Sequence, residues 1–205
     1  MLRNMLIGLL LGSSLLWSCG PSEVKTQEPV EETAEDVIDV TDNITWDDCG
    51  GAIGDKACDF TFIDQNAVDW NLYEHYGTVM ILDFSAIWCG VCRNIASDAQ
   101  VIQDTFTDQG YEFIWVTILV DGASWGVSPS PDEIDDWVDS YGMTSSPVLT
   151  GDRSVIDTSG ADGYPVSGWP TLVIVDETLT ITHGINGWNE AAVMGWLEDV
   201  LLAAQ

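Results

Sequence analysis

The sequence predicts one α/β domain, in which helices pack against a central mixed β-sheet. Two observations predict it: apolar runs of strand length alternate with segments of helical periodicity, and the last two strand candidates follow each other without a helix between them. Strands that are separated by helices favour parallel pairing, whereas two successive strands favour an antiparallel hairpin. A chain of 205 residues is long enough to bury the core of such a domain.

Five segments have the composition of strands. They span residues 60–63, 78–86, 111–120, 171–176 and 179–183. The second segment is an almost continuous apolar run whose only charged residue is Asp83. This is the pattern of a central strand that is buried on both faces of the sheet.

Three segments have helical periodicity, and each has a recognisable start. Residues 90–108 place apolar side chains at helical spacing directly after a strand. Pro131 opens the helix predicted over residues 131–141, and acidic side chains follow in its first turn, where the helix dipole favours them. Asn189 is positioned to cap a last helix over residues 190–203.

The N-terminus has the features of a lipoprotein-type signal peptide over residues 1–19. Arg3 precedes an apolar run over residues 5–17, which is too short to span a bilayer because a spanning helix needs ~20 residues. The segment that ends at Cys19 resembles the bacterial lipobox, whose cysteine receives a lipid, although Trp17 is bulkier than the usual residue there. We therefore expect lipidation at Cys19 and a location on the bacterial cell envelope, facing the periplasm or the exterior; plain secretion is the alternative.

Residues 20–45 are strongly acidic and contain no aromatic residue. Eight acidic side chains stand there against a single base, Lys25. Such a composition buries too little apolar surface to offset the entropy of ordering. The segment is therefore predicted to be a disordered tether between the lipid and a domain over residues 46–205. An acidic tail that binds a partner is the alternative interpretation.

The charge of the whole chain limits its possible partners. The chain has 34 acidic and 5 basic residues, which gives a formal net charge of −29. Such a surface repels phosphate backbones and anionic lipid headgroups. Nucleic acid is therefore not expected as a partner.

The cysteines form two close pairs once Cys19 is set aside for the lipid. An exported protein meets an oxidising compartment, where paired cysteines form disulfides. Cys49 and Cys58 bracket a glycine-rich turn, which favours a structural disulfide, with a second redox pair as the alternative. Cys89 and Cys92 form a C-x-x-C motif between a predicted strand and a predicted helix.

A C-x-x-C motif also occurs in zinc sites, but this chain lacks the further ligands. A structural zinc site needs four ligands, usually from a second such motif or from histidines. The chain has one C-x-x-C and two histidines, His75 and His183, which are far apart in the sequence. We therefore expect no metal, and no cofactor other than a redox-active disulfide between Cys89 and Cys92.

Two segments resemble thioredoxin. Residues 81–92, which contain the C-x-x-C, resemble its active-site segment, and residues 168–176 resemble its cis-proline segment with the strand that follows. Residues 53–55 and 59–60 resemble the lead-in of membrane-tethered TlpA-type redoxins. The resemblance covers residues 46–205, and it implies a thioredoxin-like α/β/α sandwich that acts as a thiol-disulfide oxidoreductase.

The resemblance implies a role for each residue of the site. Cys89 is the attacking cysteine, because a helix N-terminus lowers the pKa of a thiol, and Cys92 is the buried resolving one. Asp83 is a buried acid with a raised pKa that accepts the Cys92 proton. The residues that bind or support the substrate are Trp88, Trp169, a cis Pro170 and Thr171.

The implied partners are thiols and disulfides of exported proteins, together with a membrane or periplasmic electron donor. Two other functions stay open: a thiolate copper-binding protein and an inactive surface interaction module on the same fold. A peroxiredoxin requires a threonine three residues before its first cysteine, where this chain has Ala86. Val91 replaces a proline of thioredoxin and Ser85 replaces a tryptophan, so the resemblance does not define the redox potential or the client.

Overall fold

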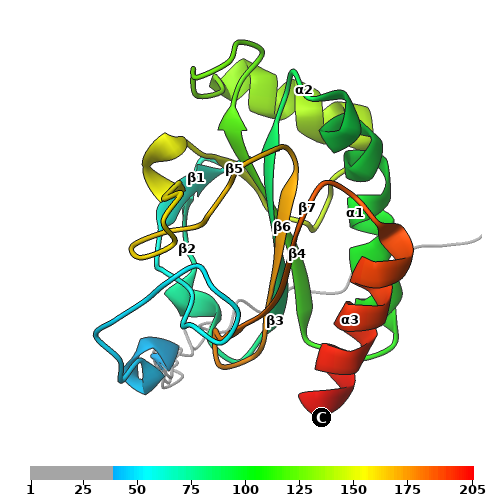
Figure 1. The fold of residues 1–205 in the computed structure, drawn as a ribbon. Helices are drawn as coiled ribbons and strands as arrows, with labels where there is room; N and C mark the ends of the chain where they lie inside the picture. The colour runs from blue at the N-terminus through cyan, green and yellow to red at the C-terminus, as the bar shows by residue number, and fades with distance from the viewer. Residues whose placement is uncertain (1–38) are drawn as a thin grey trace, which may run out of the picture. The chain divides into compact units, whose positions relative to one another are not determined.

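The computed structural model describes residues 39–205. The predicted signal peptide, Cys19 and most of the predicted tether lie outside the described residues. Within the described part of the chain, no helix is both long and apolar enough to cross a membrane. Figure 1 shows the central sheet, with helices α1 and α3 packed along the same side of it.

Seven strands form one mixed sheet, in the order β2-β1-β5-β4-β3-β6-β7. The strands are β1 (Thr61–Asp64), β2 (Asp69–Asn71), β3 (Val79–Ala86), β4 (Phe113–Asp121), β5 (Val148–Thr150), β6 (Thr171–Val175) and β7 (Ile181–Asn186). Strands β3, β4 and β5 pair in parallel, and the other neighbours pair antiparallel. The predicted mixed sheet and its final hairpin are confirmed. The sequence analysis missed β2 and β5, because three residues are too few to show a periodic pattern.

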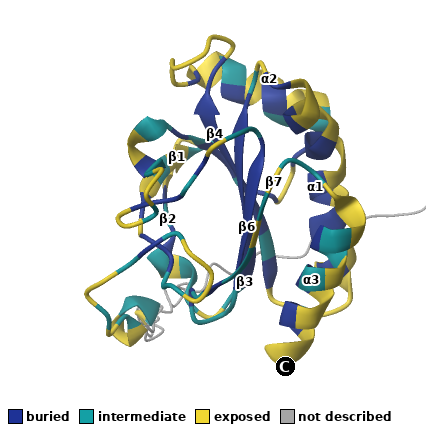
Figure 2. Cartoon of the chain, viewed as in Figure 1, coloured by how far each residue is buried: buried dark blue, intermediate teal, exposed yellow. Residues whose placement is uncertain are grey.

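Strand β3 lies inside the sheet because both of its faces are covered. All eight of its residues are buried, and it pairs with β4 on one side and with β6 on the other. The dark blue of the central strands in Figure 2 shows this burial. Its last residue, Ala86, leads into the turn that carries Cys89, so the sheet places the C-x-x-C motif at the end of a rigid strand.

The α-helices have the bounds that the sequence predicts: α1 (Gly90–Asp108), α2 (Pro131–Tyr141) and α3 (Glu190–Ala203). Each begins with a side chain that caps free backbone N–H groups. The Cys89 sulfur caps α1, Ser130 and Glu133 form a capping box on α2, and Asn189 caps α3. The start of each helix is therefore fixed by local chemistry.

The sheet separates two apolar clusters. One packs between the sheet and the three α-helices, and it contains both Cys89 and Cys92. The other lies on the opposite face, which is covered by loops and by the 3-10 helices η2 (Tyr73–His75) and η3 (Arg153–Val155) instead of α-helices. Cys58 belongs to this second cluster.

The folded domain includes the last residues of the predicted tether. A 3-10 helix, η1 (Val40–Asn43), lies within residues 20–45, and Asp39 caps it by accepting a hydrogen bond from the Thr41 N–H. Ile44 packs against the second cluster. The capped turn and the packed apolar side chain therefore give these residues a defined structure.

Candidate active site

Cys89 and Cys92 meet at the start of α1. A disulfide joins them, and their Cα atoms lie 5.3 Å apart. The Cys89 sulfur accepts a hydrogen bond from the Cys92 N–H at 3.1 Å. Cys89 keeps 6% of its surface exposed and Cys92 keeps none, so a partner molecule reaches Cys89 first. The positive end of the helix dipole and the N–H group both favour a thiolate at Cys89.

Asp83 lies in β3, on the face of the sheet that α1 covers. Its side chain is fully buried, and it pairs in register with Thr117 of β4 and Leu172 of β6. Laterally paired residues of neighbouring strands point to the same face. Leu172 belongs to the cluster that contains Cys92, so Asp83 points to the side that carries the redox pair.

Burial sets the protonation behaviour of Asp83. It raises the pKa of this carboxyl to about 7, and the side chains of Ser85 and Trp115 oppose part of this rise. The Ser85 hydroxyl donates to Asp83 Oδ1 at 2.6 Å, while Oδ2 has no hydrogen-bond partner among residues 39–205. A carboxyl with this pKa exchanges its proton near neutral pH, as a general acid or base requires.

Among the buried polar atoms that lack a hydrogen-bond partner within the described domain, Thr117 Oγ1 and Trp115 Nε1 lie in the strand next to Asp83. Both residues belong to β4, and its register with β3 places them on the face of Asp83. An unpartnered buried polar atom costs ~1–3 kcal/mol, so such atoms beside a buried carboxyl are unusual for a plain core. Sequence reasoning missed Thr117, because only the strand register brings it beside Asp83.

The structure brings the two thioredoxin-like segments together. The rings of Trp88 and Trp169 meet edge to face, with their centroids 6.3 Å apart. The Trp169–Pro170 peptide bond is cis. The Thr171 hydroxyl hydrogen-bonds to the Gly168 carbonyl at 2.8 Å and so closes the turn around this bond. Thr171 thus supports the turn, while Trp88 is exposed beside the redox pair.

An ion pair between the buried Asp121 and the partly exposed Arg153, which was not predicted from the sequence, holds Trp88 in place. The Trp88 indole N–H donates to Asp121 Oδ2 at 3.3 Å, and Arg153 donates to both oxygens of the same carboxylate. Burial raises the pKa of Asp121, but the hydrogen bonds and the charge of Arg153, together with hydrogen bonds from the Gly126 backbone and Trp88, hold the pKa below its usual range. A signal existed in the sequence, since Arg153 is one of only three bases in residues 46–205.

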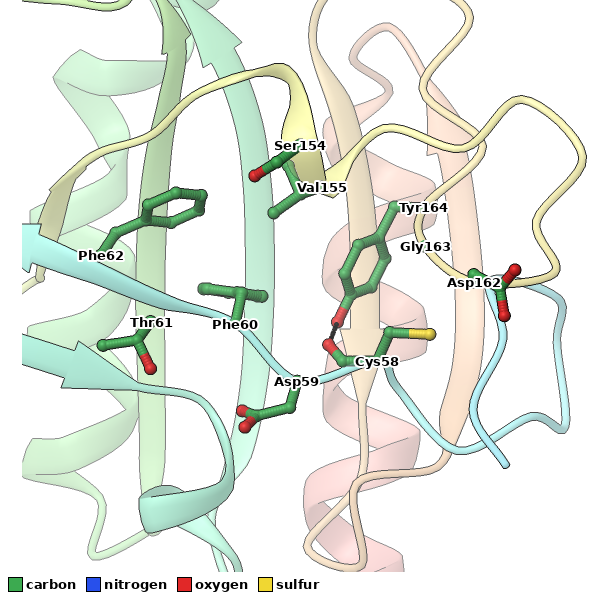
Figure 3. Close-up of a pocket in the computed structure, with 10 residues that line it drawn as sticks. All are labelled: Cys58, Asp59, Phe60, Thr61, Phe62, Ser154, Val155, Asp162, Gly163 and Tyr164. Atoms are coloured by element: carbon green, nitrogen blue, oxygen red, sulfur yellow. Dashed lines mark hydrogen bonds between the residues drawn. The ribbon is translucent and has the colours of Figure 1, made fainter. Parts of the chain in front are cut away.

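Cys49 and Cys58 form a second disulfide, with a Cα–Cα distance of 4.8 Å. Figure 3 shows Cys58 at the edge of a hollow of about 190 Å³, where its carbonyl accepts a hydrogen bond from the Tyr164 hydroxyl at 2.7 Å. This hollow and Cys58 lie on the face opposite to Cys89 and Cys92. The sheet therefore separates the two disulfides, which supports a structural role for Cys49–Cys58 over an electron relay.

No cluster of three or more His, Cys, Asp or Glu side chains able to hold a metal ion occurs within residues 39–205. A copper-binding function would therefore depend on the Cys89 and Cys92 thiolates without a third such ligand from the described residues.

Residues 53–184 match the sequence model of the AhpC/TSA family. The chain belongs to the AhpC/TSA family. This match includes Asp83, both cysteines of the C-x-x-C and Pro170, so the whole candidate site of this AhpC/TSA member lies inside it. A search of curated proteins finds no significant match to the chain.

Solved structures resemble this AhpC/TSA domain over nearly their whole length. A protein assigned as the thiol:disulfide interchange protein DsbE of Chlorobium tepidum is 23% identical, with 75% of this chain and 98% of that chain covered and a TM-score of 0.59. A protein assigned as a disulfide isomerase of Bacteroides thetaiotaomicron is 21% identical, with coverages of 76% and 94% and a TM-score of 0.60. The exposed lipoprotein thioredoxin Etrx1 of Streptococcus pneumoniae is 22% identical, with coverages of 69% and 99% and a TM-score of 0.55. These likenesses confirm the predicted thioredoxin-like fold.

Proposed function

We propose that this protein is an extracytoplasmic thiol-disulfide oxidoreductase that exchanges disulfides with exported proteins through Cys89 and Cys92. The observation that carries the proposal is the cysteine pair at the N-terminus of α1, on the face of the sheet where the fully buried Asp83 lies. The names of the similar structures support it, since they include thiol:disulfide interchange proteins and a lipoprotein thioredoxin.

The first step of the proposed reaction is attack on a client disulfide. In the reduced protein, the Cys89 thiolate attacks one sulfur of the client. The client S–S bond breaks, a bond forms between Cys89 and the client, and the released client thiolate takes up a proton. The helix N-terminus favours the charged form of Cys89 that this step needs.

The second step releases the client. Cys92 gives its proton to the ionised Asp83, directly or through water, and attacks the Cys89 sulfur. The bond between Cys89 and the client breaks, and the second client thiolate leaves and takes up a proton. Cys89 and Cys92 end as a disulfide, and the client gains two electrons. The same steps in reverse oxidise a client dithiol.

The proposal is tested by reducing insulin disulfides with the pre-reduced full-length protein. We expect reduction of one disulfide per protein molecule, and complete loss of this activity in Cys89→Ser. The double variant Cys49→Ala/Cys58→Ala is the matched control, because it removes the other disulfide and should keep the activity. If insulin stays oxidised while the reduced protein rapidly consumes hydrogen peroxide, the protein is a peroxidase instead.

We also propose that Cys19 carries a lipid that anchors the protein to the cell envelope, where a membrane or periplasmic donor supplies electrons. The apolar run before Cys19 and the acidic segment after it support this location. In a bacterial host, the protein should fractionate with membranes, and Cys19→Ala should move it to the soluble fraction. Equal membrane association of both forms would contradict the anchor.

A further inference from the structure

Exposed apolar side chains gather around the redox motif. The described domain exposes nine large apolar side chains, and four of them lie in three short segments: the turn before Cys89, the first turn of α1 and the loop after β4. These four are Trp88, Val91, Trp125 and Val127. Trp125 is 71% exposed. Among residues 39–205, the exposed tryptophans are Trp88 and Trp125. Large exposed apolar groups that cluster are typical of a binding surface.

A continuous series of contacts links Trp125 to the redox motif. The guanidinium of Arg153 lies 4.3 Å from the centre of the Trp125 ring. Arg153 binds Asp121, and Asp121 accepts the hydrogen bond from the Trp88 indole. The loop itself is closed by the Gly122 N–H, which donates to the Val127 carbonyl at 2.7 Å. Trp88 and Trp125 are therefore parts of one surface, although 37 residues separate them in the sequence.

An acidic hollow of about 290 Å³ adjoins the same loop and the redox motif. It lies between α1 and α2, and its lining includes Ile87, Arg93, Glu133, Asp136 and Tyr141. Glu133 accepts a hydrogen bond from the Ala123 N–H at 2.9 Å, and so ties α2 to the loop that carries Trp125. Hydrogen bonds from the backbone of Ser130 and Ala123 hold the pKa of Glu133 below its usual range, so it is ionised at neutral pH.

The charges around this surface favour a cationic occupant. Residues 46–205 contain 26 acidic side chains and three basic ones. Two of the three bases lie near this surface: Asp121 compensates the charge of Arg153, whereas Arg93 donates to the Ile87 carbonyl at 2.8 Å and keeps its charge in the lining of the hollow, where the two carboxylates of Glu133 and Asp136 outnumber it. Asp136 is exposed in the wall of the hollow and has no hydrogen-bond partner among the described residues that would compensate its charge. A field of one sign over a cleft raises the rate at which oppositely charged ligands arrive.

We propose that this surface docks client segments that are both basic and apolar. We define the client surface as Trp88, Val91, Trp125 and Val127 together with the hollow that Glu133 and Asp136 line. An apolar side chain near the client cysteine covers Trp125, and a neighbouring lysine or arginine enters the hollow beside Asp136. The inference rests on the proposed function and adds to it a substrate class: unfolded segments in which basic residues flank a cysteine.

The test compares two synthetic disulfide-bonded peptides with the same apolar residues. One has lysines around each cysteine and the other has glutamates. The full-length protein, reduced beforehand and freed of reductant, is mixed with each peptide at 20 mM and 500 mM NaCl, and the second-order rate constant of the single turnover is measured. At low salt the lysine peptide should react ~10-fold faster or more, and the difference should shrink at high salt as screening grows.

Two variants assign the effect to the client surface. Trp125→Ala should lower the rate constant for the lysine peptide several-fold more than it lowers the rate constant for 2-hydroxyethyl disulfide, a small uncharged disulfide without a large apolar side chain. Asp136→Asn should reduce the preference for the lysine peptide. The matched controls are Leu202→Ala and Asp199→Asn, which remove an exposed apolar side chain and a carboxylate from α3; both should retain the full preference.

The possible outcomes distinguish a failure of the docking inference from a failure of the proposed function. Equal rates for the two peptides, or a faster glutamate peptide, would overturn the inference while the oxidoreductase function stands. If Asp199→Asn reduced the preference for the lysine peptide as much as Asp136→Asn does, the inference would also be overturned, because the preference would then depend only on the overall charge. Failure to reduce either peptide, insulin or 2-hydroxyethyl disulfide would remove the proposed function itself, and the inference with it.

Discussion

The Trp88 indole donates a hydrogen bond to the buried carboxylate of Asp121 at 3.3 Å. Arg153 binds the same carboxylate through two nitrogens, at 2.9 and 2.6 Å. The residue that precedes Cys89 is therefore held by a buried acid, which is in turn held by an arginine from another part of the chain. Arg153 is a positioning residue, since it acts on the redox site only through Asp121 and Trp88.

Replacing this arginine should destabilise the domain. Arg153→Met leaves the Asp121 carboxylate buried without its cation, and we expect a loss of about 1–3 kcal/mol in the free energy of unfolding. The figure is below that of a fully buried pair, because the Arg153 side chain is 38% exposed. Urea unfolding followed by tryptophan fluorescence measures it.

Arg153→Lys is the matched control for this prediction. Lysine keeps the charge but lacks the planar fork that binds both carboxylate oxygens, so its effect should fall between wild type and Arg153→Met. The NMR signal of the Trp88 indole N–H reports the positioning role, because its chemical shift changes when the hydrogen bond to Asp121 is lost. If Arg153→Met were as stable as wild type, the ion pair between Arg153 and Asp121 would not contribute to stability.

The buried carboxyl of Asp83 should make stability depend on pH in a defined direction. Its pKa is raised from 3.8 to about 7 in the folded protein, so the folded state binds the proton more tightly than the unfolded state. The contribution of the Asp83 carboxyl to the free energy of unfolding is then fully present below about pH 4, and it is lost as the pH rises towards 7. Across this range the cost of ionising Asp83 is on the order of 4 kcal/mol.

The variant Asp83→Asn isolates this effect. Asparagine stays neutral, so the stability of wild type relative to Asp83→Asn should fall between pH 4 and pH 7 and then level off. Urea unfolding of both proteins at a series of pH values gives the difference. A difference that is independent of pH would show that Asp83 has an ordinary pKa. The same variant should slow client release above pH 7, because the Cys92 proton loses its acceptor.

The parts of this fold that could be predicted have strong local signals. The three α-helices were predicted to the residue, because Pro131, Asn189 and the cysteine motif each define a helix start in the sequence itself. The burial of Asp83 was also predictable, since it is the single charge in an apolar strand. In contrast, β2 and β5 are three residues long, and they exist because longer neighbours offer them hydrogen bonds.

The parts of the site that were missed depend on contacts between distant segments. Asp121 and Arg153 are 32 residues apart, and nothing in either segment indicates its partner. Thr117 reaches the side of Asp83 only through the register of β3 with β4. The cysteines, the tryptophan and the proline carry motif information, whereas the residues that position them are defined only by the tertiary structure.

The disulfide between Cys49 and Cys58 should contribute to stability and not to catalysis. It closes a loop with a sequence separation of nine residues, for which chain entropy predicts a contribution of about 2.5–3 kcal/mol. The double variant Cys49→Ala/Cys58→Ala should therefore lose about this much in the free energy of unfolding and still reduce insulin. Loss of insulin reduction in a variant that remains folded would instead support a second redox pair.

The separate roles of Cys89 and Cys92 should be visible in the products that each variant traps. In Cys92→Ser, the Cys89 thiolate still lies at the start of α1 and attacks a client disulfide, but no second thiol is present to release the client. Mixed disulfides should therefore accumulate, and they should be visible as adducts in mass spectra under non-reducing conditions. Peptide mapping should place the client on Cys89.

Cys89→Ser is the matched control for this trap. It retains the Cys92 thiol, but this residue is fully buried and lies beyond the helix N-terminus. Burial raises the pKa of a thiol and also blocks the approach of a client sulfur, so Cys89→Ser should form few adducts under the same conditions. Both variants keep the Cys49–Cys58 disulfide, so a difference between them comes from the redox pair alone. Accumulation of adducts in Cys89→Ser, and not in Cys92→Ser, would reverse the two roles.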